Sequence, residues 1–170
     1  MNPAAIRLFI MDVDGTLTDG TITYSADGVE LKSFHARDGA GIKLLPSANI
    51  RPAIVTGRTS TAVDRRAKEL GIDIVVQGAG DKLAVVDRLR VEASLAWEEI
   101  AFVGDDLTDL PPMRQAGFSA APADADPEVQ RIATYVCRLP GGRGAVREAI
   151  ETLLRRQGLW DGILADLGAR

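Results

Sequence analysis

Residues 9–20, FIMDVDGTLTDG, run from an apolar segment straight into Asp12, Asp14 and Asp19. Carboxylates that lie so close together repel one another, and partial burial at the end of a strand makes each charge more costly. A bound cation is the first candidate to offset that cost. This stretch therefore predicts a buried strand whose carboxyl end holds a metal ion.

The rest of the chain alternates between short apolar runs and helical stretches. Most of the runs are continuously apolar, which is typical of parallel strands that are buried on both faces. Strands are expected over residues 7–13, 51–56, 73–77, 100–104, 118–121 and 135–137. Helices are expected over residues 38–48, 59–70, 81–94, 108–116, 126–132 and 144–156. This alternation predicts an α/β protein with a doubly wound, mostly parallel, Rossmann-like sheet.

One segment departs from the alternation. Residues about 19–35 read as two strands around a turn at Asp27-Gly28, because Ile22 and Tyr24 alternate with polar residues. This β-hairpin is inserted after the first strand and is too small to form a separate domain. The 170 residues are expected to form a single domain, residues 1–170, with a C-terminal tail from about residue 158.

The bulk composition narrows the functional classes. A net charge of −4 gives no general basic character, so nucleic acid is not expected as a partner. No stretch is long enough to span a membrane, and the N-terminal apolar run is too short for a signal peptide. The only cysteine, Cys137, is expected in the core and cannot form an intramolecular disulfide. We expect a soluble cytoplasmic protein.

Reactive side chains fall where the expected strands end, and open α/β sheets bind ligands at that edge. They are Asp12, Asp14, Thr56, Gly57, Arg58, Asp105 and Asp106, with Lys82 opening a helix and Asp109 one turn after the fourth strand. Several carboxylates at one point suit Mg²⁺, and the added donors suit a phosphoryl group. One aspartate could then attack phosphorus to give an aspartyl-phosphate. A second, two residues on, could protonate the leaving oxygen and later activate water.

Four segments, DVDGTLT, VTGR, Lys82 and GDDLTD, resemble in order the motifs of haloacid dehalogenase superfamily phosphatases. The resemblance implies that Asp12 is the nucleophile and Asp14 the general acid and base. It implies that Thr56 and Lys82 hold the phosphoryl oxygens. Magnesium would be bound by the carboxylates of Asp12 and Asp105 and the backbone carbonyl of Asp14, while Asp106 supports the site through water.

Longer segments, including FHARDGAGIKLL, VGDDLTDLPPMRQAG and GGRGAVRE, are similar to the branch that hydrolyses 3-deoxy-D-manno-octulosonate 8-phosphate. This resemblance covers residues from about 6 to 157. It implies a homotetramer with no large cap domain, a role in lipopolysaccharide biosynthesis and a sugar acid phosphate as substrate. Planar guanidinium groups read carboxylates well, so Arg58, Arg66 and Arg143 are the candidate substrate contacts, and Arg66 could act from a neighbouring subunit. Phosphates of nine-carbon sialic-type sugar acids are the nearest rival substrates.

Other interpretations stay open at this stage. A signalling receiver domain also combines carboxylates, Mg²⁺, a threonine and a lysine, but its acceptor aspartate follows the third strand, where this chain has Gln77-Gly78. A catalytically silent scaffold is a further alternative. Asp109 could equally be an ordinary first-turn helix residue, and Arg66 and Arg143 could be surface charges. The only histidine, His35, is expected to be an exposed residue of the flap.

Overall fold

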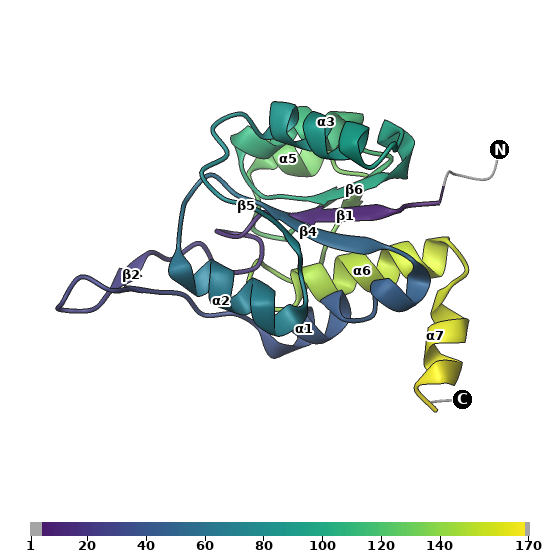
Figure 1. Cartoon of the computed structure of the whole chain (residues 1–170), viewed down its shortest axis with the longest axis horizontal. Helices are drawn as coiled ribbons and strands as arrows, with labels where there is room; N and C mark the ends of the chain where they lie inside the picture. The colour runs from purple at the N-terminus through teal and green to yellow at the C-terminus, as the bar shows by residue number, and fades with distance from the viewer. Residues whose placement is uncertain (1–4, 169–170) are drawn as a thin grey trace.

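A computed structural model describes residues 5–168, and in this range one parallel sheet forms the centre of the molecule (Figure 1). Its strand order is β5-β4-β1-β6-β7-β8, and every neighbouring pair is parallel. The strands are β1 (Leu8–Met11), β4 (Arg51–Val55), β5 (Ile74–Val76), β6 (Ile100–Val103), β7 (Phe118–Ala121) and β8 (Tyr135–Val136). The doubly wound parallel sheet predicted from the sequence is confirmed.

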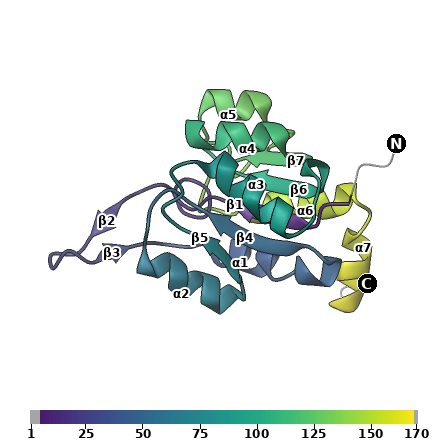
Figure 2. The same cartoon turned by 45° about the horizontal axis from the view of Figure 1, so that its top comes forward.

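Helices cover both faces of the sheet (Figures 1 and 2). One layer contains α1 (Ala36–Ile42), α2 (Thr61–Leu70) and α6 (Ala145–Arg156), and the other contains α3 (Lys82–Glu92), α4 (Leu110–Gln115) and α5 (Pro127–Ile132). Single 3₁₀ turns lie at Pro46–Ala48, Trp97–Glu99 and Leu107–Asp109.

The central strand β1 explains why its apolar run is unbroken. Phe9 and Met11 belong to the core on the α1/α6 side, whereas Leu8 and Ile10 belong to the core on the α3/α5 side. All four residues are fully buried. Successive side chains of a strand point to opposite faces, so a strand covered on both sides needs apolar residues at every position.

Two helical regions differ from the prediction. The helix expected over residues 38–48 ends at Ile42, and a separate 3₁₀ turn begins at Pro46, whose missing N–H cannot continue an α-helix. The predicted tail contains an additional helix, α7 (Trp160–Asp166), because Trp160 and Ile163 bury their side chains against the core. Residues 169–170 of the predicted tail lie outside the described range.

The expected hairpin projects from the edge of the molecule that holds the carboxyl ends of the strands (Figure 2). It consists of β2 (Thr23–Tyr24) and β3 (Glu30–Leu31), which pair antiparallel. Its apolar side chains are 40–59% exposed in the part of the chain that the structure describes; they are Ile22, Tyr24, Val29 and Leu31. An apolar surface of this kind needs a partner.

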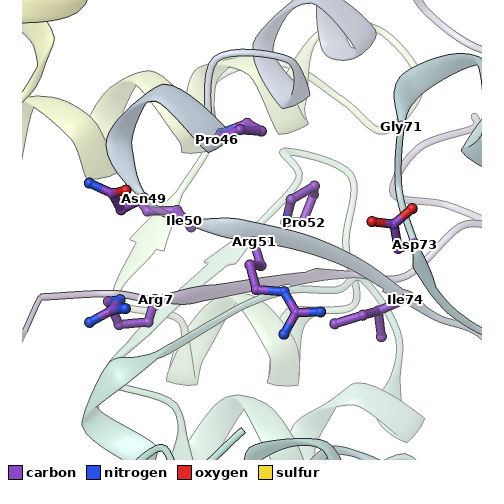
Figure 3. Close-up of a pocket in the computed structure, with 9 residues that line it drawn as sticks. All are labelled: Arg7, Pro46, Asn49, Ile50, Arg51, Pro52, Gly71, Asp73 and Ile74. Atoms are coloured by element: carbon purple, nitrogen blue, oxygen red, sulfur yellow. The ribbon is translucent and has the colours of Figure 1, made fainter.

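A hollow of about 410 Å³ opens at the opposite edge of the sheet (Figure 3). Its lining includes Arg7, Arg51 and Asp73, which lie at or just before the amino ends of β1, β4 and β5. Parallel sheets bind reacting ligands at the other edge, so this hollow is not the predicted site. No helix within residues 5–168 is long and apolar enough to cross a membrane.

Candidate active site

Most of the site residues follow three neighbouring strands, β4, β1 and β6, at the edge of the sheet where the carboxyl ends of the strands lie. Met11 of β1 pairs with Ile54 of β4 on one side and with Val103 of β6 on the other. The segments that follow these strands therefore leave the sheet side by side. The backbone N–H of Asp12 donates to the carbonyl of Val103 at 2.9 Å, which places the Asp12 side chain next to the loop that begins at Gly104.

A buried ammonium group lies at the centre of the site. Lys82 is the first residue of α3, and its side chain is only 3% exposed. Its Nζ lies 2.8 Å from Oδ2 of Asp12 and 2.6 Å from Oδ1 of Asp109. Burial alone lowers the pKa of Lys82, but the two carboxylates outweigh it and raise the pKa above its ordinary value. Lys82 therefore stays protonated and holds a positive charge beside Asp12.

The carboxylates at this point fit a hard divalent cation. One oxygen from each of Asp12, Asp105 and Asp109 lies within 4.8 Å of the others. Oδ1 of Asp12 is buried and has no hydrogen-bond partner among the described residues. Burial, with the charges of Asp12 and Asp109 adding to it, raises the pKa of Asp105 to about 7 against the opposing hydrogen bond from Thr16. A divalent cation bound at this point would give the Asp12 oxygen a partner and stabilise the charged form of Asp105.

Asp109 has a different part in this cluster. Its Oδ1 accepts from Lys82, and its Oδ2 accepts from the backbone N–H groups of Asp105 and Asp106 at 3.0 and 3.2 Å. Both oxygens are thus engaged in a side chain that is fully buried. Asp12 and Asp105 remain as the carboxylates free to ligate a cation, and Asp109 positions Lys82 and the loop after β6.

The raised pKa of Asp105 makes cation binding depend on pH. A proton occupies this carboxyl below about pH 7, so Mg²⁺ must displace it in order to bind. We expect the affinity for Mg²⁺ to fall by up to about tenfold for each pH unit below 7 and to level off above it, since one proton is released. Titration calorimetry at pH 6, 7 and 8 measures this. An affinity that is constant from pH 6 to 8 would contradict the placement of Asp105 at the ion.

The predicted phosphate-binding residues follow β4. Thr56 is 2% exposed, its N–H donates to the carbonyl of Val76, and its carbonyl accepts from Ala79 at 3.0 Å. Gly57 is exposed, and a Cβ there would make only an ordinary contact of 3.9 Å with the carbonyl of Ala79. These residues lie beside the segment after β1, in the position that the sequence predicts. Asp106 is exposed, and its carboxylate accepts from the N–H of Leu107 at 2.8 Å as a helix cap.

Asp14 turns its carboxylate toward the hairpin. Its Oδ1 accepts a charge-assisted hydrogen bond from Nζ of Lys32, and its Oδ2 lies 3.7 Å from Nε of Arg58. Arg58 also pairs with Glu30 at 2.9 Å and donates to the hydroxyl of Tyr24 at 3.2 Å. Arg58, one of the three predicted substrate contacts, is therefore at the site edge and is held there by hairpin residues.

The other two predicted arginines do not join this cluster within residues 5–168. Arg66 lies over the ring of Phe34 at 5.8 Å and pairs with Glu69 on its own helix at 3.3 Å. Arg143 pairs with Asp19 at 3.5 Å, and its side chain is 66% exposed. In this single chain, neither guanidinium forms an ion pair with Asp12 or Asp14.

Several residues of the site have no marked signal in the sequence. The hydroxyl of Thr16 donates to Oδ1 of Asp105 at 2.9 Å, which links the loops after β1 and β6. Lys32 and Glu30 come from the hairpin, where alternation marks them only as a polar face. The position of Thr16 directly after Asp14-Gly15 is the one sequence feature that could have indicated its place in the site. Nothing local distinguishes Lys32 from an exposed lysine.

His35 differs from its expected exposure, and Asp38 is a buried carboxylate that the sequence does not mark. His35 is half-buried rather than exposed, and its Nδ1 is buried without a partner among the described residues. Asp38 is 1% exposed and accepts from the backbone N–H groups of Gly144 and Arg147 at 3.2 and 2.7 Å. Asp38 thereby joins α1 to the start of α6. Cys137 is buried, as predicted.

Two glycines allow the loop after β1 to pack closely. Gly15 has a φ of +88°, and a Cβ there would overlap the carboxylate of Asp105. Gly141 lies against the same loop, where a Cβ would overlap the carbonyl oxygen of Gly15. Its N–H donates to Asp124 at 2.9 Å, and the N–H of Gly142 donates to the carbonyl of Thr16 at 3.0 Å. The glycine-rich segment before α6 thus supports the loop that carries Asp14.

Substitution of Gly141 is expected to disturb this loop. In Gly141→Ala the new methyl group collides with backbone, which cannot give way cheaply, so we expect a loss of about 1–3 kcal/mol of stability. Turnover should fall with it, because the displaced loop carries Asp14. Gly162→Ala is the matched control, since nothing lies within 4 Å of its Cβ and alanine favours helix. Thermal unfolding and phosphate release measure both effects. Equal behaviour of the two variants would contradict the contact.

Comparison with known proteins places this geometry in a family. Residues 36–117 match the sequence model of the haloacid dehalogenase-like hydrolases. Over 92% of its length, the chain is 47% identical to the 3-deoxy-D-manno-octulosonate 8-phosphate phosphatase of Escherichia coli K12, of which it covers 83%. The chain belongs to this phosphatase family. It is also 45% identical to the Yersinia pestis member, over 94% of the chain and 85% of that relative.

Solved structures of the family agree with the fold. The Moraxella catarrhalis phosphatase, crystallised with magnesium, phosphate and 3-deoxy-D-manno-octulosonate, superposes with a TM-score of 0.92 at 42% identity, covering 95% of this chain and 93% of that one. The cobalt-bound Haemophilus influenzae enzyme gives 0.88 at 40% identity, covering 94% of both chains. The resemblance and the fold class predicted from the sequence are confirmed.

Proposed function

We propose that this protein is a magnesium-dependent phosphatase that hydrolyses 3-deoxy-D-manno-octulosonate 8-phosphate through an aspartyl-phosphate intermediate. The chain is 47% identical to the 3-deoxy-D-manno-octulosonate 8-phosphate phosphatase of Escherichia coli K12. The structural observation that supports the proposal is the environment of Asp12. Asp12 is 6% exposed, one of its oxygens pairs with Lys82, and the other is buried without a partner among the described residues. A carboxylate in this state is suited to attack phosphorus.

The two half-reactions use two aspartates. A carboxylate oxygen of Asp12 forms a bond to phosphorus while the ester P–O bond breaks, and Asp14 gives its proton to the departing sugar oxygen. Asp14 then takes a proton from water, the water oxygen bonds to phosphorus, and the bond between phosphorus and Asp12 breaks to release phosphate. Asp12 is regenerated as the carboxylate and Asp14 as the acid.

Positive charge must meet the phosphoryl oxygens during this transfer. Lys82 lies 2.8 Å from Asp12, so its ammonium screens the nucleophile from the phosphate and then stabilises the transferring oxygens. Thr56 and the N–H of Gly57 would donate to the same oxygens. The carboxylates of Asp12 and Asp105 and the backbone carbonyl of Asp14 would hold the Mg²⁺. When bound, this ion neutralises charge on the phosphoryl group.

The carboxylate of the sugar acid needs a cationic contact away from the phosphate. Arg58 is the best placed of the three predicted arginines, because its guanidinium already lies beside Asp14. Arg143 would act from the glycine-rich segment before α6, and Arg66 from a neighbouring subunit. All three remain proposals for substrate contact.

The quaternary state and cellular setting extend the proposal. The hairpin exposes Ile22, Tyr24, Val29 and Leu31, which supports assembly through this hairpin into a homotetramer. Sedimentation equilibrium tests it, because the wild type should be a tetramer and Tyr24→Asp a smaller species; a monomeric wild type would contradict it. We further propose that residues 1–170 act as one phosphatase domain in the cytoplasm.

A panel of sugar acid phosphates tests the function directly. We expect kcat/KM to be highest for 3-deoxy-D-manno-octulosonate 8-phosphate, by at least about tenfold over nine-carbon sialic-type 9-phosphates, because a pocket set for one chain length loses contacts with another. A higher kcat/KM for a nine-carbon ester would contradict the proposed substrate but not the proposed phosphatase mechanism. A long-lived phosphorylated protein with no turnover on any ester would contradict the enzymatic role and favour a receiver.

A further inference from the structure

A lysine of the projecting hairpin is buried inside the site. Lys32 directly follows β3, and its side chain is only 1% exposed although the apolar hairpin residues around it are 40–59% exposed. Its Nζ makes a charge-assisted hydrogen bond to Oδ1 of Asp14 and lies 3.6 Å from Oε1 of Glu30. The end of β3 is thus followed by a cation that points into the site.

The energetics explain why this contact is specific. An ammonium group taken out of water is costly unless charged partners compensate for it. Lys32 has two such partners, since the side chains of Asp14 and Glu30 are themselves only 18% and 15% exposed. Moving the end of the hairpin would break the contact between Lys32 and Asp14, and the carboxylate of Asp14 would keep only its 3.7 Å ion pair with Arg58. The position of the hairpin and the orientation of Asp14 are therefore tied together.

We propose that Lys32 is a positioning residue for the proton transfers of Asp14. By holding Oδ1, it fixes the carboxylate in one orientation and leaves Oδ2, which makes only a 3.7 Å ion pair with Arg58, to meet the leaving-group oxygen. The inference rests on the proposed role of Asp14 as general acid. It assigns a function to Lys32 and explains why the hairpin contacts the site.

The orientation of the Asp14 carboxyl group affects the rate of ester cleavage only when the leaving group must be protonated as it departs. Phenyl phosphate and p-nitrophenyl phosphate have similar size, but p-nitrophenolate departs without protonation far more readily than phenolate. The parameter kcat/KM covers the steps up to departure of the leaving group. Loss of the acid should therefore lower kcat/KM for phenyl phosphate much more than for p-nitrophenyl phosphate.

The experiment measures kcat/KM on both aryl phosphates for Lys32→Met, Lys32→Arg and Asp14→Asn. Lys43→Met, on the exposed end of α1, is the matched control. We expect Lys32→Met to lower kcat/KM for phenyl phosphate at least about tenfold more than for p-nitrophenyl phosphate, within the range of general acid catalysis. Lys32→Arg should recover part of the difference because it keeps the cation.

The outcomes separate the inference from the function on which it rests. If Asp14→Asn distinguishes the two esters and Lys32→Met does not, Lys32 has only a structural role and the inference is overturned alone. If Asp14→Asn lowers both esters equally, the acid role of Asp14 fails and the inference fails with it. Circular dichroism and the unfolding temperature of each variant establish that the compared proteins are folded. Neither ester contains a sugar, so the identity of the natural substrate does not affect the result.

Discussion

Asp12→Asn is expected to abolish turnover, with a fall in kcat of more than about 10⁴-fold, because a carboxamide cannot attack phosphorus. The fold should survive the change. Lys82 keeps its second partner, Asp109, at 2.6 Å, so the buried ammonium is not left alone. Phosphate release from p-nitrophenyl phosphate measures the activity, and the unfolding temperature reports the fold.

A matched substitution far from the site shows whether the loss of one negative charge by itself affects turnover. Asp73 is exposed at the amino edge of the sheet, so Asp73→Asn removes one carboxylate charge without touching the loops after β1, β4 or β6. We expect its turnover to stay within about twofold of the wild type, as for surface changes generally. A folded Asp12→Asn variant whose turnover stays within tenfold of the wild type would remove Asp12 from the role of nucleophile.

Removal of magnesium is expected to reduce turnover to the background rate, and added Mg²⁺ should restore it. Without a cation, Lys82 is the only positive side chain paired with Asp12 among residues 5–168, and the carboxylate of Asp105 pairs only with the hydroxyl of Thr16. Exhaustive chelation with EDTA followed by Mg²⁺ titration measures the effect. Full activity after chelation would contradict the metal role.

Thermal unfolding gives a second readout of the same ion. Mg²⁺ binds the folded protein, so at 100 times its dissociation constant it should add about 2.7 kcal/mol of stability. Asp105→Asn should lose most of this stabilisation, because a carboxamide is a poor ligand for a hard cation. Equal stabilisation of both proteins would place the ion elsewhere.

The sequence was sufficient for the parts of the fold that depend on local pattern. The unbroken apolar run of β1 follows from burial on both faces, and its end at Asp12 marks the reactive edge of a parallel sheet. Short helices were harder, because their limits depend on tertiary contacts. The helix α7 forms where Trp160 and Ile163 pack against the core. The apolar residues Trp160, Ile163, Leu164 and Leu167 have helical spacing, but the segment is only two turns long and falls within the expected tail.

The same division holds for the site. Asp12, Asp105 and Lys82 follow or open regular elements, so strand order alone brings them together. The sequence leaves Asp109 open as an ordinary helix residue, and only its burial beside Lys82 distinguishes it. Lys32 escaped prediction because a hairpin that projects from a sheet gives no indication of which of its polar residues turns inward.

A crystal structure of the protein with Mg²⁺ and trifluoroberyllate, a mimic of the phosphoryl group, shows whether Asp12 carries the phosphoryl group beside the ion. We expect the beryllium to be bonded to a carboxylate oxygen of Asp12, its fluorines to contact Thr56 and Lys82, and Mg²⁺ to be bound by Asp12 and Asp105. A fluoroberyllate attached to another residue, or an ion that Asp105 does not ligate, would contradict this assignment.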